Sequence, residues 1–210
     1  MSVQLPNDPA RDDVLAGRPA LWLNPNLKAN GIADQSLPIR AAQVKEAEEN
    51  WQLLAPVLET CFPELKASKG RIQSKLIEAE DLRGALGYGT SEYGRVFVKA
   101  DGDLPVAGSI KARGGVYEVF MHAKKMAEKR GILTPGGDIT VLVGEQARAL
   151  FAQHTIAVGS TGNLGLSVGI AARALGFRAV VHMSSDAKQW KVDRLTRLGV
   201  EVVQHKADYT

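Results

Sequence analysis

Residues 155–205 read TIAVGSTGNLGLSVGIAARALGFRAVVHMSSDAKQWKVDRLTRLGVEVVQH, and this stretch decides the fold class. Two hydrophobic periods alternate along it. Short runs rich in β-branched residues, typical of buried strands, stand at 155–158, 178–183 and 200–204, and segments with helical spacing separate them. Strands that alternate with helices form parallel sheets through right-handed crossovers. The stretch therefore predicts an α/β fold with parallel strands.

The two helix–strand units of this stretch also resemble each other. A Leu-Gly pair closes each helix, at 175–176 and at 198–199, and His182 and His205 end the strands that follow. Asp186 is expected to cap the second helix. No helix follows the last strand within these 210 residues, so the repeating pattern is interrupted and we expect a truncated chain.

A second motif lies upstream, where residues 107–115 read AGSIKARGG after a strand candidate at 96–98. A helix is expected to begin in this motif and to stop before Gly131. Its apolar face consists of Val116, Val119, Phe120, Ala123 and Ala127. Lys111 therefore lies in the first helical turn. Before residue 94 the pattern predicts one amphipathic helix, with Val44, Trp51 and Leu54 on its apolar face.

Composition limits the class of protein. The chain has 210 residues, of which 45% are hydrophobic and 23% are charged, as in soluble globular proteins. The formal net charge is +3, but the basic residues stand beside acidic ones and form no runs with aromatics. This pattern argues against a nucleic-acid partner. The four histidines have neither the HExxH spacing nor a cysteine at ligand spacing, so no metal site is expected.

The single cysteine and the polar N-terminus bear on location. Cys61 has no second cysteine to pair with, so it excludes an internal disulfide and fits a reducing compartment. Asp8, Asp12 and Asp13 stand where a secretory signal would need an apolar run, and no window is long and apolar enough to cross a membrane. We expect a cytoplasmic protein with no membrane partner.

The glycine-rich loop VGSTGNLG at 158–165 joins a strand to a helix N-terminus, a place where backbone N–H groups bind anions. Its glycines, at 159, 162 and 165, match neither a Walker loop nor the GxGxxG pattern. Two interpretations stay open for the loop taken alone. It binds a phosphate or carboxylate, or its glycines only let the helix pack closely on the strand.

Lys111 is the candidate for covalent chemistry. The positive end of the helix dipole and burial among Gly, Ala and Ser both favour the neutral amine, which is a nucleophile. Neutral lysine amines form Schiff bases with carbonyl compounds, pyridoxal phosphate foremost. The alternative is a surface lysine in a glycine-rich turn.

The run KADGDLPVAGSIKARGGVYEV at 99–119 resembles the lysine segment of the fold type II pyridoxal phosphate enzymes. Within that family, IAVGSTGNLGLSVGI at 156–170 and VHMSSDAKQWK at 181–191 are similar to the bacterial D-serine dehydratases. The resemblance runs from about Trp22 to the last residue. Family members are roughly twice as long, so the chain corresponds to their N-terminal half and lacks the later glycine loop and the partner of the ring nitrogen.

The resemblance implies roles for particular residues. Lys111 would hold pyridoxal phosphate as a Schiff base and would then remove the Cα proton of the substrate. Asn163 would hydrogen-bond the 3-hydroxyl oxygen of the ring, and Ser160, Thr161 and Gly162 would face the substrate carboxylate. The implied reaction is the dehydration and deamination of D-serine to pyruvate and ammonia, with D-threonine as a slower substrate.

The resemblance also implies an organisation. The fold would be an incomplete form of the parallel-sheet architecture of tryptophan synthase β, with residues 1–134 in the cofactor domain and residues 135–210 beginning a small domain. The full-length form would be monomeric. Three alternatives stay open: an L-threonine or L-serine dehydratase-like lyase, a non-catalytic fragment, and an NAD(P)-binding oxidoreductase that uses the loop at 159–165.

Overall fold

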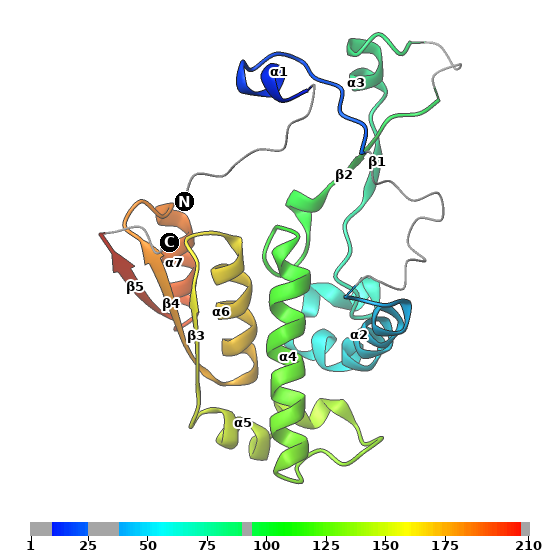
Figure 1. The fold of residues 1–210 in the computed structure, drawn as a ribbon. Helices are drawn as coiled ribbons and strands as arrows, with labels where there is room; N and C mark the ends of the chain where they lie inside the picture. Colours follow the sequence, from blue (N-terminus) through cyan, green and yellow to red (C-terminus); the bar gives the residue numbers. More distant parts are fainter. Residues whose placement is uncertain (1–9, 25–37, 90–93, 207–210) are drawn as a thin grey trace. The chain divides into compact units, whose positions relative to one another are not determined.

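A computed structural model of the chain describes residues 10–24, 38–89 and 94–206 (Figure 1). The chain divides into two compact units, residues 1–44 and residues 45–210. The first contains the short helix α1 (Arg11–Leu15), and α2 (Ala41–Cys61) begins there and continues into the second. All candidate site residues lie in the second unit. The expected domain boundary after residue 134 stays a prediction.

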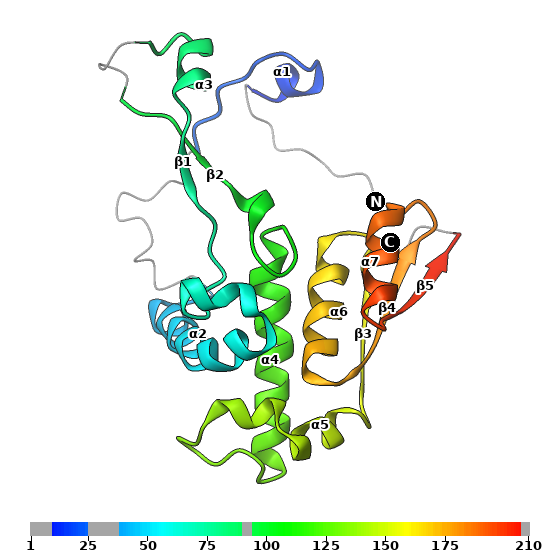
Figure 2. The same cartoon turned by 180° about the vertical axis from the view of Figure 1, so that it is seen from behind.

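The second unit contains the parallel sheet expected from the alternating pattern. Strands β3 (Thr155–Gly159), β4 (Arg178–Ser184) and β5 (Glu201–His205) pair in the order β3-β4-β5, all parallel. The helices α6 (Asn163–Leu175) and α7 (Gln189–Arg197) connect them, and Figure 2 shows the arrangement from behind. The predicted α/β architecture is confirmed for this part of the chain.

The sheet buries one face. Along β4, Ala179, Val181 and Met183 are buried, whereas Val180 and His182 between them stay partly exposed. This alternation follows from the two-residue period of a strand. Helix α6 covers the buried face, because a Cβ added to Gly165 would lie 2.8 Å from Cγ1 of Val181.

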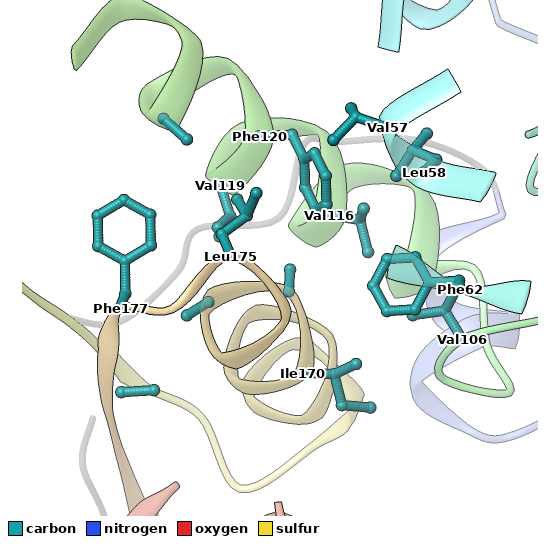
Figure 3. Packing of buried hydrophobic residues seen from close by; sticks show 14 of the residues in the cluster. Val57, Leu58, Phe62, Val106, Val116, Val119, Phe120, Ile170, Leu175 and Phe177 are labelled. Atoms are coloured by element: carbon teal, nitrogen blue, oxygen red, sulfur yellow. The ribbon is translucent and has the colours of Figure 1, made fainter. Parts of the chain in front are cut away.

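Helix α4 (Lys111–Lys129) runs through the middle of the core and buries the apolar face expected for it. Its first residue is Lys111, which agrees with the prediction that this lysine lies in the first turn, and Gly131 follows its end with a φ of +69°. Figure 3 shows the core on both sides of α4. Side chains from α2 and the residue after it lie on one side, and side chains from α6 and the residue before β4 lie on the other, namely Val57, Leu58, Phe62, Ile170, Leu175 and Phe177. Full burial of each such side chain stabilises the fold by about 1.5–3 kcal/mol.

Several elements were not anticipated by the sequence patterns. Strand β1 (Leu76–Glu78) pairs antiparallel with β2 (Phe97–Lys99), and α3 (Glu80–Ala85) lies between them in the chain. Only β2 was foreseen. Helix α5 (Glu145–Phe151) ends in a phenylalanine whose ring stacks on Phe177 at a centroid distance of 4.5 Å. These elements are three to seven residues long, too short for a hydrophobic period to be recognised.

No helix in the part of the chain that the structure describes is long and apolar enough to span a bilayer.

Candidate functional site

Lys111 begins α4 directly after a tightly bonded loop. The Lys111 backbone N–H donates to Oγ of Ser109 at 3.2 Å, and the Ala112 N–H donates to the Ser109 carbonyl at 2.9 Å. Ser109 is nearly buried, so its hydroxyl is committed to the start of the helix. The first turn that carries the lysine is therefore fixed by its own loop.

The close approach of α4 and α6 brings two predicted site residues to the same end of two helices. A Cβ added to Gly115 would lie 2.9 Å from Cβ of Ser167, so the helices touch where glycine has no side chain. Lys111 lies four residues before Gly115, and Asn163 lies four residues before Ser167. Both helices run in the same direction from this end (Figure 1). Because four residues make about one helical turn, Lys111 and Asn163 both lie one turn above the contact.

The loop at 160–162 continues the sheet before it enters α6. The Ser160 N–H donates to the carbonyl of His182 at 2.8 Å, and the Gly162 N–H donates to Oγ of Ser160 at 3.3 Å. A Cβ on Gly165 would lie 2.7 Å from the Ser160 carbonyl oxygen. This glycine is needed for close packing. The packing interpretation of the loop thus holds for Gly165 and leaves an anion-binding role for the preceding residues open.

Thr161 is held by a network that the sequence did not reveal. Its Oγ1 accepts the Ser184 N–H at 3.2 Å and lies 2.9 Å from Oγ of Ser184, which in turn donates to the carboxylate of Asp186. Since Ser184 has one hydroxyl hydrogen, and Asp186 takes it, the Thr161 hydroxyl must donate to Ser184. Thr161 therefore has no free hydroxyl hydrogen for a substrate, and its backbone N–H remains.

The same network corrects one expectation. Asp186 was expected to cap the helix after β4, but the N-cap of α7 is Lys188. The Asp186 carboxylate binds the Ser184 hydroxyl two residues earlier. Short polar side chains such as aspartate bond either forward to a helix or back to a turn, and periodicity does not distinguish the two.

Exposure differs among the predicted site residues. Ser160 is buried, Thr161, Gly162 and Asn163 are half-buried, and Lys111 is exposed. The expectation that Lys111 is buried among small neighbours is thus wrong in the part of the chain that the structure describes. Small side chains leave room around an amine, but only other segments can exclude water from it.

Charges near the lysine loop are paired with neighbours. The Asp101 carboxylate accepts a hydrogen bond from Oγ of Ser74 at 2.6 Å and lies 3.5 Å from Nζ of Lys99. The hydrogen bond from Ser74 and the nearby Lys99 charge lower the pKa of Asp101. Asp101 therefore stays ionised and fixes the start of the loop to the segment before β1.

No group of three or more metal-ligating side chains occurs among residues 10–24, 38–89 and 94–206. Two of these side chains form a pair, because Nδ1 of His182 lies 2.9 Å from Nε2 of His205 at the carboxyl ends of β4 and β5. The two rings stack at a centroid distance of 5.1 Å.

The arrangement suits a flat aldehyde cofactor. An exposed primary amine begins one helix, a half-buried amide begins the adjacent helix, and Gly115 at the contact lets the two helices approach closely. An amine bonds covalently to an aldehyde, and an amide hydrogen-bonds a ring oxygen. The residues present therefore fit the chemistry of pyridoxal phosphate.

Comparison with known proteins agrees with this chemistry. The model of the family described as "Pyridoxal-phosphate dependent enzyme" matches residues 68–210. A protein named "Probable D-serine dehydratase" from Rhizobium etli is 64% identical over the whole chain, which covers 47% of that protein. One of the same name from Acidovorax ebreus is 48% identical over 99% of the chain and 48% of its own length. The chain thus spans about half the length of these curated relatives.

Solved structures support the fold. Escherichia coli diaminopropionate ammonia lyase in its apo form matches 79% of this chain and 39% of its own, with a TM-score of 0.53 at 21% identity. The same lyase in complex with an aminoacrylate-PLP azomethine reaction intermediate matches 79% of this chain and 36% of its own, with a TM-score of 0.54 at 22% identity. With the site geometry and the family match, the chain belongs to the pyridoxal-phosphate dependent enzymes of fold type II.

Proposed function

We propose that this chain carries the lysine and asparagine half of a D-serine dehydratase, which converts D-serine to pyruvate and ammonia. The observation that carries the proposal is the common position of Lys111 and Asn163 in the first turns of two touching helices. The names of the relatives support the substrate, and the family supports the cofactor.

Each residue has a role in this proposal. The Lys111 amine would hold the cofactor through its aldehyde group and would accept the Cα proton of the substrate. The Asn163 amide orients the ring by a hydrogen bond to a ring oxygen. Ser160, Thr161 and Gly162 hold the substrate carboxylate, with the Thr161 contribution coming from its N–H because its hydroxyl is occupied. Pyridoxal phosphate, when bound, withdraws electrons from the substrate Cα.

The overall reaction balances in atoms. D-serine loses its Cα proton and its β-hydroxyl group, which leave as water, and the released enamine takes up water to give pyruvate and ammonia. No oxidant or reductant is needed. A strong preference for one enantiomer follows if the carboxylate is held by the loop at 160–162, because Lys111 must lie on the side of the Cα hydrogen, within about 2.6–3.2 Å in a productive pose. The choice of the D-enantiomer rests on the names of the relatives.

The test uses a completed protein, in which these 210 residues are joined to the part of the Rhizobium etli relative that the chain does not match. We expect pyruvate release from D-serine to be far faster than from L-serine. We also expect borohydride reduction in the presence of pyridoxal phosphate to place the label on Lys111, as found by peptide mapping. Label on Lys99 or Lys188 instead would contradict the assignment. Faster release from L-serine would preserve the family chemistry and refute the substrate.

An Asn163→Ala variant of the completed protein separates the role proposed for Asn163, orienting the ring, from the role proposed for Lys111, holding the cofactor covalently. Loss of one hydrogen bond to the cofactor should lower turnover by about tenfold. Labelling of Lys111 should persist, because the amide makes no covalent bond. Asn50→Ala serves as the matched control, since Asn50 donates to the Tyr117 hydroxyl at 3.1 Å, away from the loop. Loss of labelling in Asn163→Ala alone would show that the asparagine holds the cofactor instead of orienting it.

A further inference from the structure

The loop before Lys111 contains a strained turn at Val106. Val106 has a φ of +75°, in the left-handed region that β-branched residues avoid. The Ala107 N–H donates to the Pro105 carbonyl at 3.0 Å, so the three residues form the strained kind of γ-turn. Val106 is also buried. A turn of this kind persists only where surrounding groups hold it.

One such group comes from the other side of the unit. Nη2 of Arg194, on α7, donates to the Val106 carbonyl oxygen at 2.6 Å, across 88 residues of sequence. Among the described residues, the structure gives Arg194 no carboxylate partner within ion-pair distance. A hydrogen bond from a guanidinium is stronger than one between neutral groups. Arg194 is thus directed at the backbone of the strained turn.

The same strand and helix hold both loops of the candidate site. Ser184, at the end of β4, bonds Thr161 of the asparagine loop, and Arg194, on the helix that follows, bonds the turn before Lys111. From Val106 to Lys111 the loop leaves little freedom, because the Gly108 N–H donates to the Leu104 carbonyl at 2.9 Å. A shift of the turn therefore moves the first turn of α4.

From this geometry we infer that Arg194 is a positioning residue, which holds the Val106 turn and so sets the place of Lys111 relative to Asn163. The inference rests on the proposed function for its catalytic consequence. Its structural part, that the guanidinium holds the turn, stands independently.

Arg197 provides a matched control. It lies three residues further along α7, and it lines the same groove of about 600 Å³ as Arg194 and Val106. Its Nε donates only within its own helix, to the Asp193 carbonyl at 3.3 Å. Arg197→Met therefore removes the same charge from the same groove and leaves the turn untouched.

The first experiment measures hydrogen exchange of the Ala107 and Gly108 amides in the chain itself. Arg194→Met should speed their exchange by about tenfold, because one charge-assisted hydrogen bond no longer resists opening. Arg197→Met should leave both rates unchanged. Equal rates in the two variants would overturn the inference.

The second experiment tests the link to Lys111 in the completed protein. Arg194→Met should reduce pyridoxal phosphate labelling of Lys111 relative to Lys188, and should lower kcat for D-serine by about tenfold to a hundredfold with little change in KM. Arg194→Lys should restore part of the Lys111 labelling and part of kcat, since lysine keeps a cationic donor. If the wild-type protein is not labelled at Lys111, the proposed function fails, whereas the amide exchange still decides the role of Arg194.

A rescue variant separates strain from charge. Val106→Gly adopts a positive φ without steric cost, so the turn no longer depends on the arginine. The double variant Arg194→Met with Val106→Gly should therefore recover most of the Lys111 labelling lost in Arg194→Met. An undiminished loss in the double variant would refute the positioning role.

Discussion

At the scale of single residues, the Thr161 hydroxyl shows how a loop residue is fixed by a group on another strand. The Ser184 N–H and hydroxyl both contact Oγ1 of Thr161, and Asp186 orients the Ser184 hydroxyl. These contacts direct the Thr161 side chain toward β4. The Thr161 backbone N–H is thereby left as a donor for a carboxylate, because the N–H groups of Ser160 and Gly162 already bond the His182 carbonyl and Oγ of Ser160.

Ser184→Ala should loosen this loop. We expect KM for D-serine in the completed protein to rise by about fivefold, with kcat little changed, because a hydroxyl bond to Thr161 is lost and Lys111 is untouched. Ser185→Ala is the control, since that exposed residue bonds the His205 carbonyl through its backbone N–H alone. Steady-state pyruvate assays measure both constants. An equal rise in KM in the two variants would argue against the network.

Cys61 gives a prediction about pH. Burial raises the pKa of this thiol to about 11 from the ordinary 9.0, and the charge of Arg148 opposes the rise only in part. The folded thiol thus stays protonated where the unfolded thiol ionises. The protonated thiol therefore makes its full contribution to stability below pH 9, and this contribution is lost as the pH rises from 9 through about 11.

Urea unfolding between pH 8 and pH 11 tests this sign. The free energy of unfolding of the wild-type chain should fall more steeply over that range than that of Cys61→Ala, which has no thiol to ionise. The comparison cancels the lysines and tyrosines that titrate in the same range. Parallel pH profiles would show that Cys61 does not carry the effect.

At the scale of elements, adjacent glycines of α4 face different surroundings. A Cβ on Gly115 would lie 2.9 Å from Cβ of Ser167 on α6, whereas a Cβ on Gly114 meets nothing within 4 Å. The two positions have the same helical backbone. They therefore separate the packing of α4 on α6 from helix propensity.

Gly114→Ala should stabilise the chain by up to about 1 kcal/mol, because alanine is the better helix former. Gly115→Ala should destabilise it by about 1–2 kcal/mol, because overpacking outweighs the same gain. It should also reduce labelling of Lys111 one turn away. Urea denaturation measures the stabilities. Stabilisation by both variants would mean that α4 and α6 do not pack this closely.

At the scale of the whole molecule, the exposure of Lys111 bears on cofactor retention. The sequence contains no run of three glycines that would form the usual backbone cradle for the cofactor phosphate. The Lys111 amine and the Asn163 loop are thus the groups in these residues that can hold the cofactor. Water also has access to the amine.

We therefore expect the 210-residue chain to lose pyridoxal phosphate on dialysis, whereas the completed protein keeps it in stoichiometric amount. The visible absorbance that remains after dialysis measures retention. Lys111→Ala in the completed protein is the control for covalent holding and should lose the band. Full retention by the 210-residue chain would show that its own residues suffice. A cytoplasmic location and a monomeric full-length form stay predictions.

The sequence by itself determined the parallel sheet, the long helix with Lys111 in its first turn, and the asparagine loop at the start of α6. The physical reason is that hydrophobic period and glycine placement are local properties of the chain. The residues chosen from these motifs, Lys111 and Asn163, lie at the same end of two touching helices.

Only the tertiary structure decided which distant groups support these motifs. The hydrogen bond from Arg194 to Val106 and the network from Asp186 to Thr161 join residues that are far apart in the sequence. No hydrophobic period relates such residues to each other. The same holds for β1, whose three residues become a strand because β2 lies beside them. Local patterns specify which face of an element is apolar, but partners across the core are chosen by packing and by hydrogen bonds that form only in the folded chain.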